Sequence, residues 1–126
     1  MSNSQSNIIP IYTTKGDAEA FLVYPYLFNR NGDWIGFVTP KRDVYSVLGQ
    51  FVGTLTNDPR IIRKRAISTL KLRVKPPPKP GRIYPPSTIP LPRMMPELSH
   101  SDLDVLQEVP ELLHTIDTGE QRQDMD

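Results

Sequence analysis

Apolar and aromatic residues recur at matching positions in the first half of the chain. The pattern of residues 27–38 returns seventeen positions later in residues 44–55, with two glycines in the same places. Each copy predicts a β-hairpin, because a short aromatic-bearing strand, a turn ending in glycine and a second strand follow one another. A weaker copy precedes them in residues 11–22, and a shortened one follows at residues 60–63. Since each unit must bury its apolar face against its neighbours, the repeat predicts an all-β hairpin-repeat domain over residues 11–66.

The glycines of the repeat fall at two kinds of position. Those at the turns favour a left-handed backbone, which glycine adopts without steric cost; they are Gly16, Gly32 and Gly49. Those inside the second strands predict a bulge, a bend or the close approach of another backbone; they are Gly36 and Gly53. The aromatic residues of the repeat are expected to form the core, and they are Tyr12, Phe28, Trp34, Tyr45 and Phe51.

The spacing of the repeat resembles that of the four-fold β-flower domain, a small bacterial family whose hairpin units surround a pseudo-four-fold axis. The unit Leu-Phe-Asn-Arg-Asn-Gly-Asp-Trp-Ile-Gly-Phe-Val at residues 27–38 carries the resemblance. It covers about residues 11–65 and extends into the basic proline-rich segment at residues 79–83. The chain departs from the family pattern at residues 18–19 and in the acidic extension after Arg93. The resemblance implies a radial hairpin fold, and it leaves function open because the family has no established activity.

The remainder of the chain is predicted to form three tails. Residues 1–10 carry neither a basic cluster nor an apolar run, so we expect a flexible N-terminus without a leader. Residues 67–96 hold most of the 14 prolines and predict a basic arm in the polyproline II conformation. We interpret this arm as a semi-rigid spacer, with a weaker match to a PxxPxR ligand motif at residues 77–82. Residues 97–126 carry a charge of −8 and predict a largely disordered acidic tail.

A short helix is expected inside the acidic tail. Five apolar residues share one helical face, and they are Val105, Val109, Leu112, Leu113 and Ile116. Ser101 is predicted to open the helix, and Pro110 to divide it into segments over residues 102–109 and 111–116. The alternative role for this segment is to bind a partner as an amphipathic helix.

Basic residues cluster between the repeat and the acidic tail. Residues 60–82 carry nine cations and no anion, and such a block attracts phosphates and anionic membrane surfaces. Six of them are candidate binding residues: Arg60, Arg63, Lys64, Arg65, Lys79 and Arg82. The alternative is that these cations only solvate the last strand and the arm. Nucleic acid is a disfavoured partner, because no stacking aromatics alternate with the cations. The acidic tail is hypothesised to screen the block, and the alternative is that both segments remain solvated and independent of each other.

Neither catalytic residues nor metal or cofactor ligands are predicted. The chain has no cysteine, no glycine-rich phosphate loop and no G-x-S-x-G elbow. His100 and His114 lie in the acidic tail and lack the spacing of a metal site. No apolar run reaches the ~20 residues that a spanning helix needs. We therefore expect a cytoplasmic protein that is not an enzyme and holds neither a metal nor a cofactor.

Two classes of function remain open. The first is a β-repeat interaction module that displays its basic proline-rich arm and acidic tail to a protein partner. The alternative is a domain that binds a small ligand or an anionic lipid headgroup with its basic last strand. The sequence identifies neither the partner nor the oligomeric state.

Overall fold

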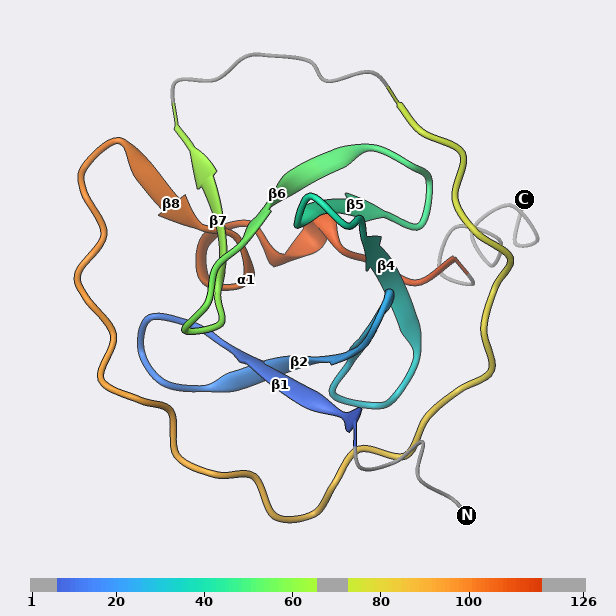
Figure 1. Cartoon of the computed structure of the whole chain (residues 1–126), viewed down its shortest axis with the longest axis horizontal. Helices are drawn as coiled ribbons and strands as arrows, with labels where there is room; N and C mark the ends of the chain where they lie inside the picture. The colour runs from blue at the N-terminus through green and yellow to red at the C-terminus, as the bar shows by residue number, and fades with distance from the viewer. Residues whose placement is uncertain (1–6, 66–72, 117–126) are drawn as a thin grey trace, which may run out of the picture.

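The computed structural model describes residues 7–65 and 73–116. Its strands are β1 (Ile9–Tyr12), β2 (Ala18–Val23), β3 (Tyr26–Asn29), β4 (Trp34–Val38), β5 (Asp43–Ser46), β6 (Phe51–Leu55), β7 (Ile61–Lys64) and β8 (Asp102–Asp104). A short helix, α1 (Val105–Glu108), and a single 3-10 turn, η2 (Pro110–Leu112), follow β8. Each strand pairs antiparallel with the next, in sequence order. The sheet curls round on itself (Figure 1), and the predicted all-β hairpin fold is confirmed.

The first three hairpins share one pattern of pairing. Ile11 faces Ala20, Leu27 faces Gly36 and Val44 faces Gly53, and in each hairpin the register shifts at the next residue of the first strand. The turn glycines have the positive φ that the sequence predicts, at +96° for Gly16, +87° for Gly32 and +82° for Gly49. The three copies of the repeat therefore fold into three equivalent units.

Both strand glycines lie where another backbone approaches closely, as predicted. A Cβ atom on Gly36 would stand 2.4 Å from the carbonyl oxygen of Tyr45, and one on Gly53 would stand 2.8 Å from that of Ile62. A Cβ on Gly36 would also meet the Leu113 side chain at 2.9 Å. These positions admit glycine because no side chain fits between the neighbouring chains.

The fourth hairpin is completed by a distant segment. The shortened repeat supplies β7, and β8 pairs with it so that Lys64 faces Asp102 and Ile62 faces Asp104. The expectation of a largely disordered tail is therefore wrong for residues 102–113, which are ordered on the edge of the sheet and in its core. A strand as short as Asp-Leu-Asp has no readable periodicity, and its partner lies far away in the sequence. The flexible N-terminus expected over residues 1–10 is wrong at Ile9 and Pro10, which belong to β1. Residues 1–6 of that segment, and residues 117–126 of the acidic tail, lie outside the described residues.

The predicted C-terminal helix is present but differs in extent. It covers Val105–Glu108 alone, and Asp104 rather than Ser101 caps it, because a carboxylate oxygen of Asp104 accepts the Gln107 N–H at 3.3 Å. Pro110 begins η2, as a proline can in a first turn. Burial of Val105, Leu106 and Leu113 fastens this segment to the domain.

Two apolar clusters make up the core. Aliphatic residues from all the strands, together with α1 and Leu113, form the main cluster. A second cluster is aromatic and lies over β3 to β5; its buried members are Phe28, Trp34, Phe37, Tyr45 and Val47. The predicted core aromatics are confirmed as buried at Tyr12, Phe28, Trp34 and Tyr45, whereas Phe51 is half-buried.

Residues 73–98 run round the outside of the curled sheet (Figure 1). They include the described part of the proline-rich arm and the first two residues of the acidic tail, and we call them the belt. Every third position along the belt is apolar, and all but Pro86 are half-buried; the series is Val74, Pro77, Pro80, Ile83, Pro86, Ile89, Pro92, Met95 and Leu98. This period matches the three residues per turn of polyproline II. The arm therefore lies against the domain with one side, and the expected spacer role is wrong for this segment.

The belt meets the hairpin turns at intervals of nine residues. The N–H of Val74 donates to the carbonyl of Gly49 at 3.0 Å, and the N–H of Ile83 donates to that of Gly32 at 3.0 Å. The Pro92 ring packs beside Gly16. Cβ atoms on Gly49 or Gly32 would lie 1.9 Å from a belt carbonyl oxygen. The turn glycines thus serve both the turn and the docking of the belt.

We expect Gly36→Ala to lower the free energy of unfolding by about 2–3 kcal/mol, because the added methyl group overlaps the Tyr45 carbonyl. Gly81→Ala is the matched control, since nothing lies within 4 Å of a Cβ there. Its stability should be unchanged or raised by a few tenths of a kcal/mol. Urea denaturation of the two variants measures the difference. Equal stabilities would contradict the close approach at Gly36.

Neighbouring belt residues give a second test. Ile83 packs against the aromatic cluster, whereas Tyr84 is 79% exposed. Ile83→Asp should lower stability by about 1–2 kcal/mol, and Tyr84→Asp should change it by less than about 0.5 kcal/mol. Hydrogen exchange of the Ile83 amide should accelerate in the first variant only. Similar exchange in both variants would show that the belt is not anchored through its inner side.

Candidate binding surfaces

Arg60 does not belong to an exposed basic surface. Its side chain is only 3% exposed and forms an ion pair with Asp58 at 2.8 Å. A second guanidinium nitrogen donates to the hydroxyl of Thr14 at 3.1 Å. The position of Arg60 among other cations predicted a binding role, but the connector between β6 and β7 directs its side chain inward. Arg60 is therefore excluded from contact with an external anion.

Arg60 belongs to a polar network that the sequence did not reveal. The backbone N–H and the hydroxyl of Thr14 both donate to one carboxylate oxygen of Asp104, each at 2.7 Å. Asp104, only 1% exposed, also caps α1. The network therefore links the first hairpin, the β6–β7 connector and the C-terminal segment. Its members lie up to 90 positions apart in the sequence, so no local pattern identifies them.

The pKa of Asp58 lies below its usual value. Burial opposes ionisation of its carboxyl group, but hydrogen bonds from Arg60 and Thr56 and the charge of Arg60 outweigh that effect. Asp58 is consequently ionised at neutral pH and compensates the buried guanidinium of Arg60.

Three other predicted cations face anionic or carbonyl groups of the chain itself. Lys64 pairs with Asp102 at 3.2 Å. The guanidinium of Arg65 meets both carboxylate oxygens of Glu108, at 3.0 and 3.1 Å. Arg82 donates to the carbonyl of Asn31, with its closest bond at 2.8 Å, and lies 3.8 Å from the Asp33 carboxylate. Carboxylates of the acidic segment thus contact two cations of the basic block directly.

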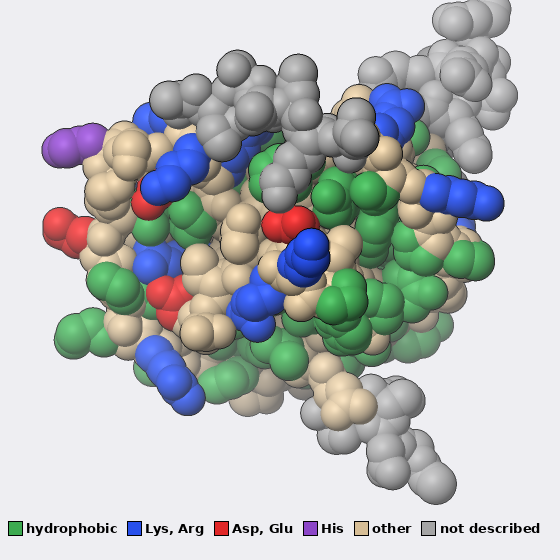
Figure 2. Space-filling view, turned by 45° about the horizontal axis from the view of Figure 1, so that its top comes forward, with side chains coloured by type: hydrophobic (Ala, Val, Ile, Leu, Met, Phe, Trp, Pro, Cys, Tyr) green, Lys and Arg blue, Asp and Glu red, His purple; other side chains and the backbone are tan. Residues whose placement is uncertain are grey.

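The six candidate cations do not form one surface. Arg63 is half-buried, whereas Lys79 is exposed on the belt and lines a small hollow with Arg82 and Trp34. Figure 2 shows one face of the molecule, where basic and acidic side chains are interspersed among apolar ones. A charge block in the sequence is divided by the fold among the strand, the connector and the belt.

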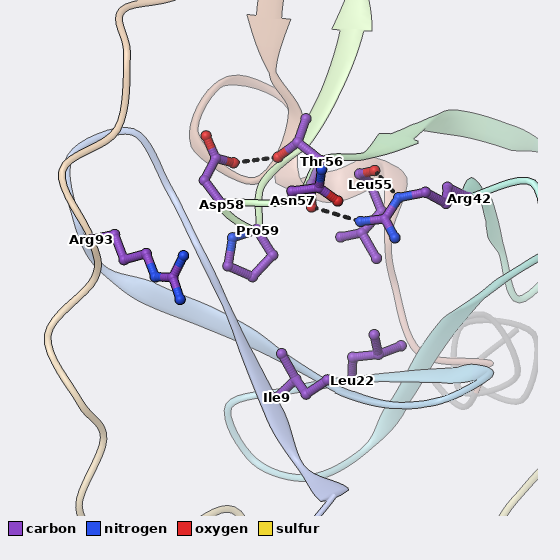
Figure 3. Close-up of a pocket in the computed structure, with 9 residues that line it drawn as sticks. All are labelled: Ile9, Leu22, Arg42, Leu55, Thr56, Asn57, Asp58, Pro59 and Arg93. Atoms are coloured by element: carbon purple, nitrogen blue, oxygen red, sulfur yellow. Dashed lines mark hydrogen bonds between the residues drawn. The ribbon is translucent and has the colours of Figure 1, made fainter.

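A pocket of about 370 Å³ lies between the first hairpin, two connectors and the belt (Figure 3). Two arginines that were not among the predicted site residues line it, Arg42 from the β4–β5 connector and Arg93 from the belt. Apolar groups form another part of its wall, and they are Ile9, Leu22, Leu55 and Pro59. No local sequence motif marks either arginine as a site residue. The pocket is lined by segments that lie far apart in the sequence and meet only in the folded structure.

The outer side of the belt exposes large apolar side chains. Leu91 is 91% exposed, Met94 is 96% exposed and Tyr84 is 79% exposed. Leu91 and Met94 are three residues apart, so they project on the same side of a polyproline II segment. Exposed apolar groups that lie together on a surface mark contact sites.

The histidines do not suggest a metal centre. His100 is exposed, and the half-buried His114 has a ring nitrogen 3.1 Å from the Thr115 carbonyl. Among residues 7–65 and 73–116, no three side chains of the types that bind metals gather together. None of the helices in the same residues is both long and apolar enough to span a bilayer.

The fold defines a class of protein, in which repeated hairpins form one curled antiparallel sheet and the chain itself encircles them. The family model described as 4-fold beta flower protein matches residues 9–111, and the chain belongs to this family. The predicted family is thereby confirmed. The match includes the belt, β8 and α1 as well as the first seven strands. No curated protein and no solved structure matches the chain.

Asp58→Asn should destabilise the protein by about 3 kcal/mol, because it leaves the buried Arg60 without its counter-charge. Asp33→Asn is the control, since Asp33 is partly exposed and lies 3.8 Å from its cation; the expected change is below about 1 kcal/mol. A depressed pKa stabilises the folded state above the unfolded value near 3.8, and this contribution is lost as the pH falls through the folded pKa. The stability of Asp58→Asn should therefore vary less below about pH 4 than that of the wild type. Parallel curves from chemical denaturation would contradict this role.

Proposed function

We propose that this β-flower domain is a non-enzymatic interaction module that binds a protein partner through the outer side of its belt. The observation that carries the proposal is the exposure of Leu91 and Met94 on a segment whose opposite side is anchored to the domain. A segment that only linked two domains would need no such anchoring. The partner is expected to offer an apolar groove, the kind of surface that receives extended proline-rich segments.

Anchoring of the belt to the domain favours binding because it lowers the conformational entropy that is lost when a partner binds. A free proline-rich tail loses conformational freedom when a partner captures it, whereas the belt is already held by the Val74 and Ile83 hydrogen bonds. The exposed side chains are therefore presented in a fixed order and spacing.

The alternative of headgroup binding by the basic last strand has less support. Lys64 and Arg65 on and beside β7 already contact Asp102 and Glu108. An external anion would have to compete with carboxylates of the same chain, which are present at high effective concentration. We therefore place the proposed contact on the belt.

Photo-crosslinking in the cells that make the protein tests the proposal. A photoreactive amino acid at Leu91 should yield one crosslinked species with another protein, and Met94→Asp in the same chain should reduce its amount several-fold. The reactive group at Thr54, an exposed residue of β6 and not of the belt, is the control and should not yield that species. A crosslink that Met94→Asp does not weaken would contradict the proposal. A species of twice the 14.3 kDa chain mass would instead indicate self-association.

A further inference from the structure

Arg42 occupies a backbone conformation that arginine rarely adopts. Its φ is +71°, and its N–H donates to the carbonyl of Thr39, three residues earlier, at 2.8 Å. In the turns of the first three hairpins, the N–H groups of Gly16, Gly32 and Gly49 likewise donate to the carbonyl three residues earlier. An L-residue is strained at such a φ. Backbone strain of this kind is concentrated at functional sites. A functional role for Arg42 is therefore expected to show in the contacts of its guanidinium.

The guanidinium of Arg42 is held at the rim of the pocket. Its Nε donates to the carbonyl of Leu55 at 2.9 Å, and one terminal nitrogen donates to that of Thr56 at 2.9 Å. Both acceptors are neutral, so the positive charge has no carboxylate partner among the described residues. The remaining N–H donors of the group are unbonded in the same residues and lie beside the pocket (Figure 3).

Arg93 supplies a second cation from the opposite side. It extends from the belt toward Pro59 in Figure 3, and it forms no hydrogen bond or ion pair within the described part of the chain. The neighbouring Pro92 packs beside Gly16, so the belt fixes where this side chain begins. Two cations from separate segments therefore flank one pocket, and no carboxylate in residues 7–65 and 73–116 forms an ion pair with either of them.

The only carboxylate among the pocket's lining residues is already neutralised. Asp58 forms its ion pair with Arg60 at 2.8 Å, which leaves the pocket with the charge of Arg42 and Arg93. Between these cations the wall is apolar, and Ile9 on it is 46% exposed. The amide of Asn57 adds a polar group that makes no hydrogen bond within the described residues.

We propose that this pocket binds a small amphipathic anion, a carboxylate or phosphate monoester on a compact apolar body. The planar forks of Arg42 and Arg93 match the geometry of carboxylate and phosphate oxygens. The apolar body would lie against Ile9 and Leu22, and a volume of about 370 Å³ admits only a small group. This site is separate from the outer side of the belt, so either function stands without the other.

Titration calorimetry with four probes tests the proposal: hexanoate, hexyl phosphate, hexanol and inorganic phosphate. Hexanoate or hexyl phosphate should bind saturably at a 1:1 ratio, and both hexanol and inorganic phosphate should bind at least about tenfold more weakly, because each lacks one half of the recognised group. Equal binding of hexanol would overturn the role of the cations. Failure of both amphipathic anions to bind at millimolar concentration would overturn the site itself.

Charge-removing variants on the belt locate the binding. Arg93→Gln should weaken binding of the anionic probe about tenfold or more, whereas Arg73→Gln, an exposed arginine of the same belt outside this pocket, should leave it within about twofold. Equal effects of the two substitutions would show only a general attraction to positive charge and would overturn the proposal. Because both side chains are exposed, neither variant is expected to unfold.

Arg42→Gly provides a second, independent variant. Glycine accepts the positive φ and keeps the backbone bonds of the turn, but it removes the guanidinium. Folding should be retained and binding lost; retained binding would overturn the role of Arg42. Vesicles containing phosphatidic acid then identify the source of the anion. Vesicle binding weakened by Arg93→Gln would support a lipid headgroup, and hexyl phosphate binding without vesicle binding would support a soluble ligand.

Discussion

The pairing of β7 with β8 is the constraint on which the rest of the structure depends. Without β8, the last strand of the repeat would present an open edge of unpaired backbone groups. Because β8 lies far along the chain, its pairing with β7 places the belt on a path round the domain (Figure 1). It also brings α1 into contact with the core, where Val105 is fully buried. The belt is thus part of the long connection between β7 and β8, the two strands of the fourth hairpin.

The belt and the hairpins are matched in their spacing. Three polyproline II turns span nine residues and about 28 Å, and this interval separates the contacts of Val74, Ile83 and Pro92 with successive hairpin turns. The belt contacts the turns of the third, second and first hairpins in that order. The chain just after the belt then meets the fourth hairpin, where Arg65 donates its N–H to the Ser101 carbonyl at 2.7 Å. The spacing of nine residues between the contacts of the belt therefore matches the spacing between successive hairpins.

A feature could be predicted from the sequence when it depends on residues that are close together along the chain. The repeat gave the hairpins, the turn glycines and the strand glycines, because a turn and its φ depend on adjacent residues. The inner side of the belt also had a local signal, an apolar residue at every third position from Val74 to Leu98, which a search for periods of 2 or 3.6 passes over. The Arg60 network and the Arg42–Arg93 pocket had no local signal, since their members come from segments that lie far apart in the sequence.

The two proposed sites share one short stretch of chain. Arg93 faces the pocket, whereas Leu91 and Met94 on either side of it are exposed outward. An anion that holds Arg93 would restrain the backbone from which both apolar side chains project, so it would reduce the freedom that a partner must remove on binding. Such coupling is reciprocal in free energy, and a bound partner would raise the affinity for the anion by the same factor. If both sites are occupied in the cell, the belt is therefore the element through which each ligand changes the affinity of the protein for the other.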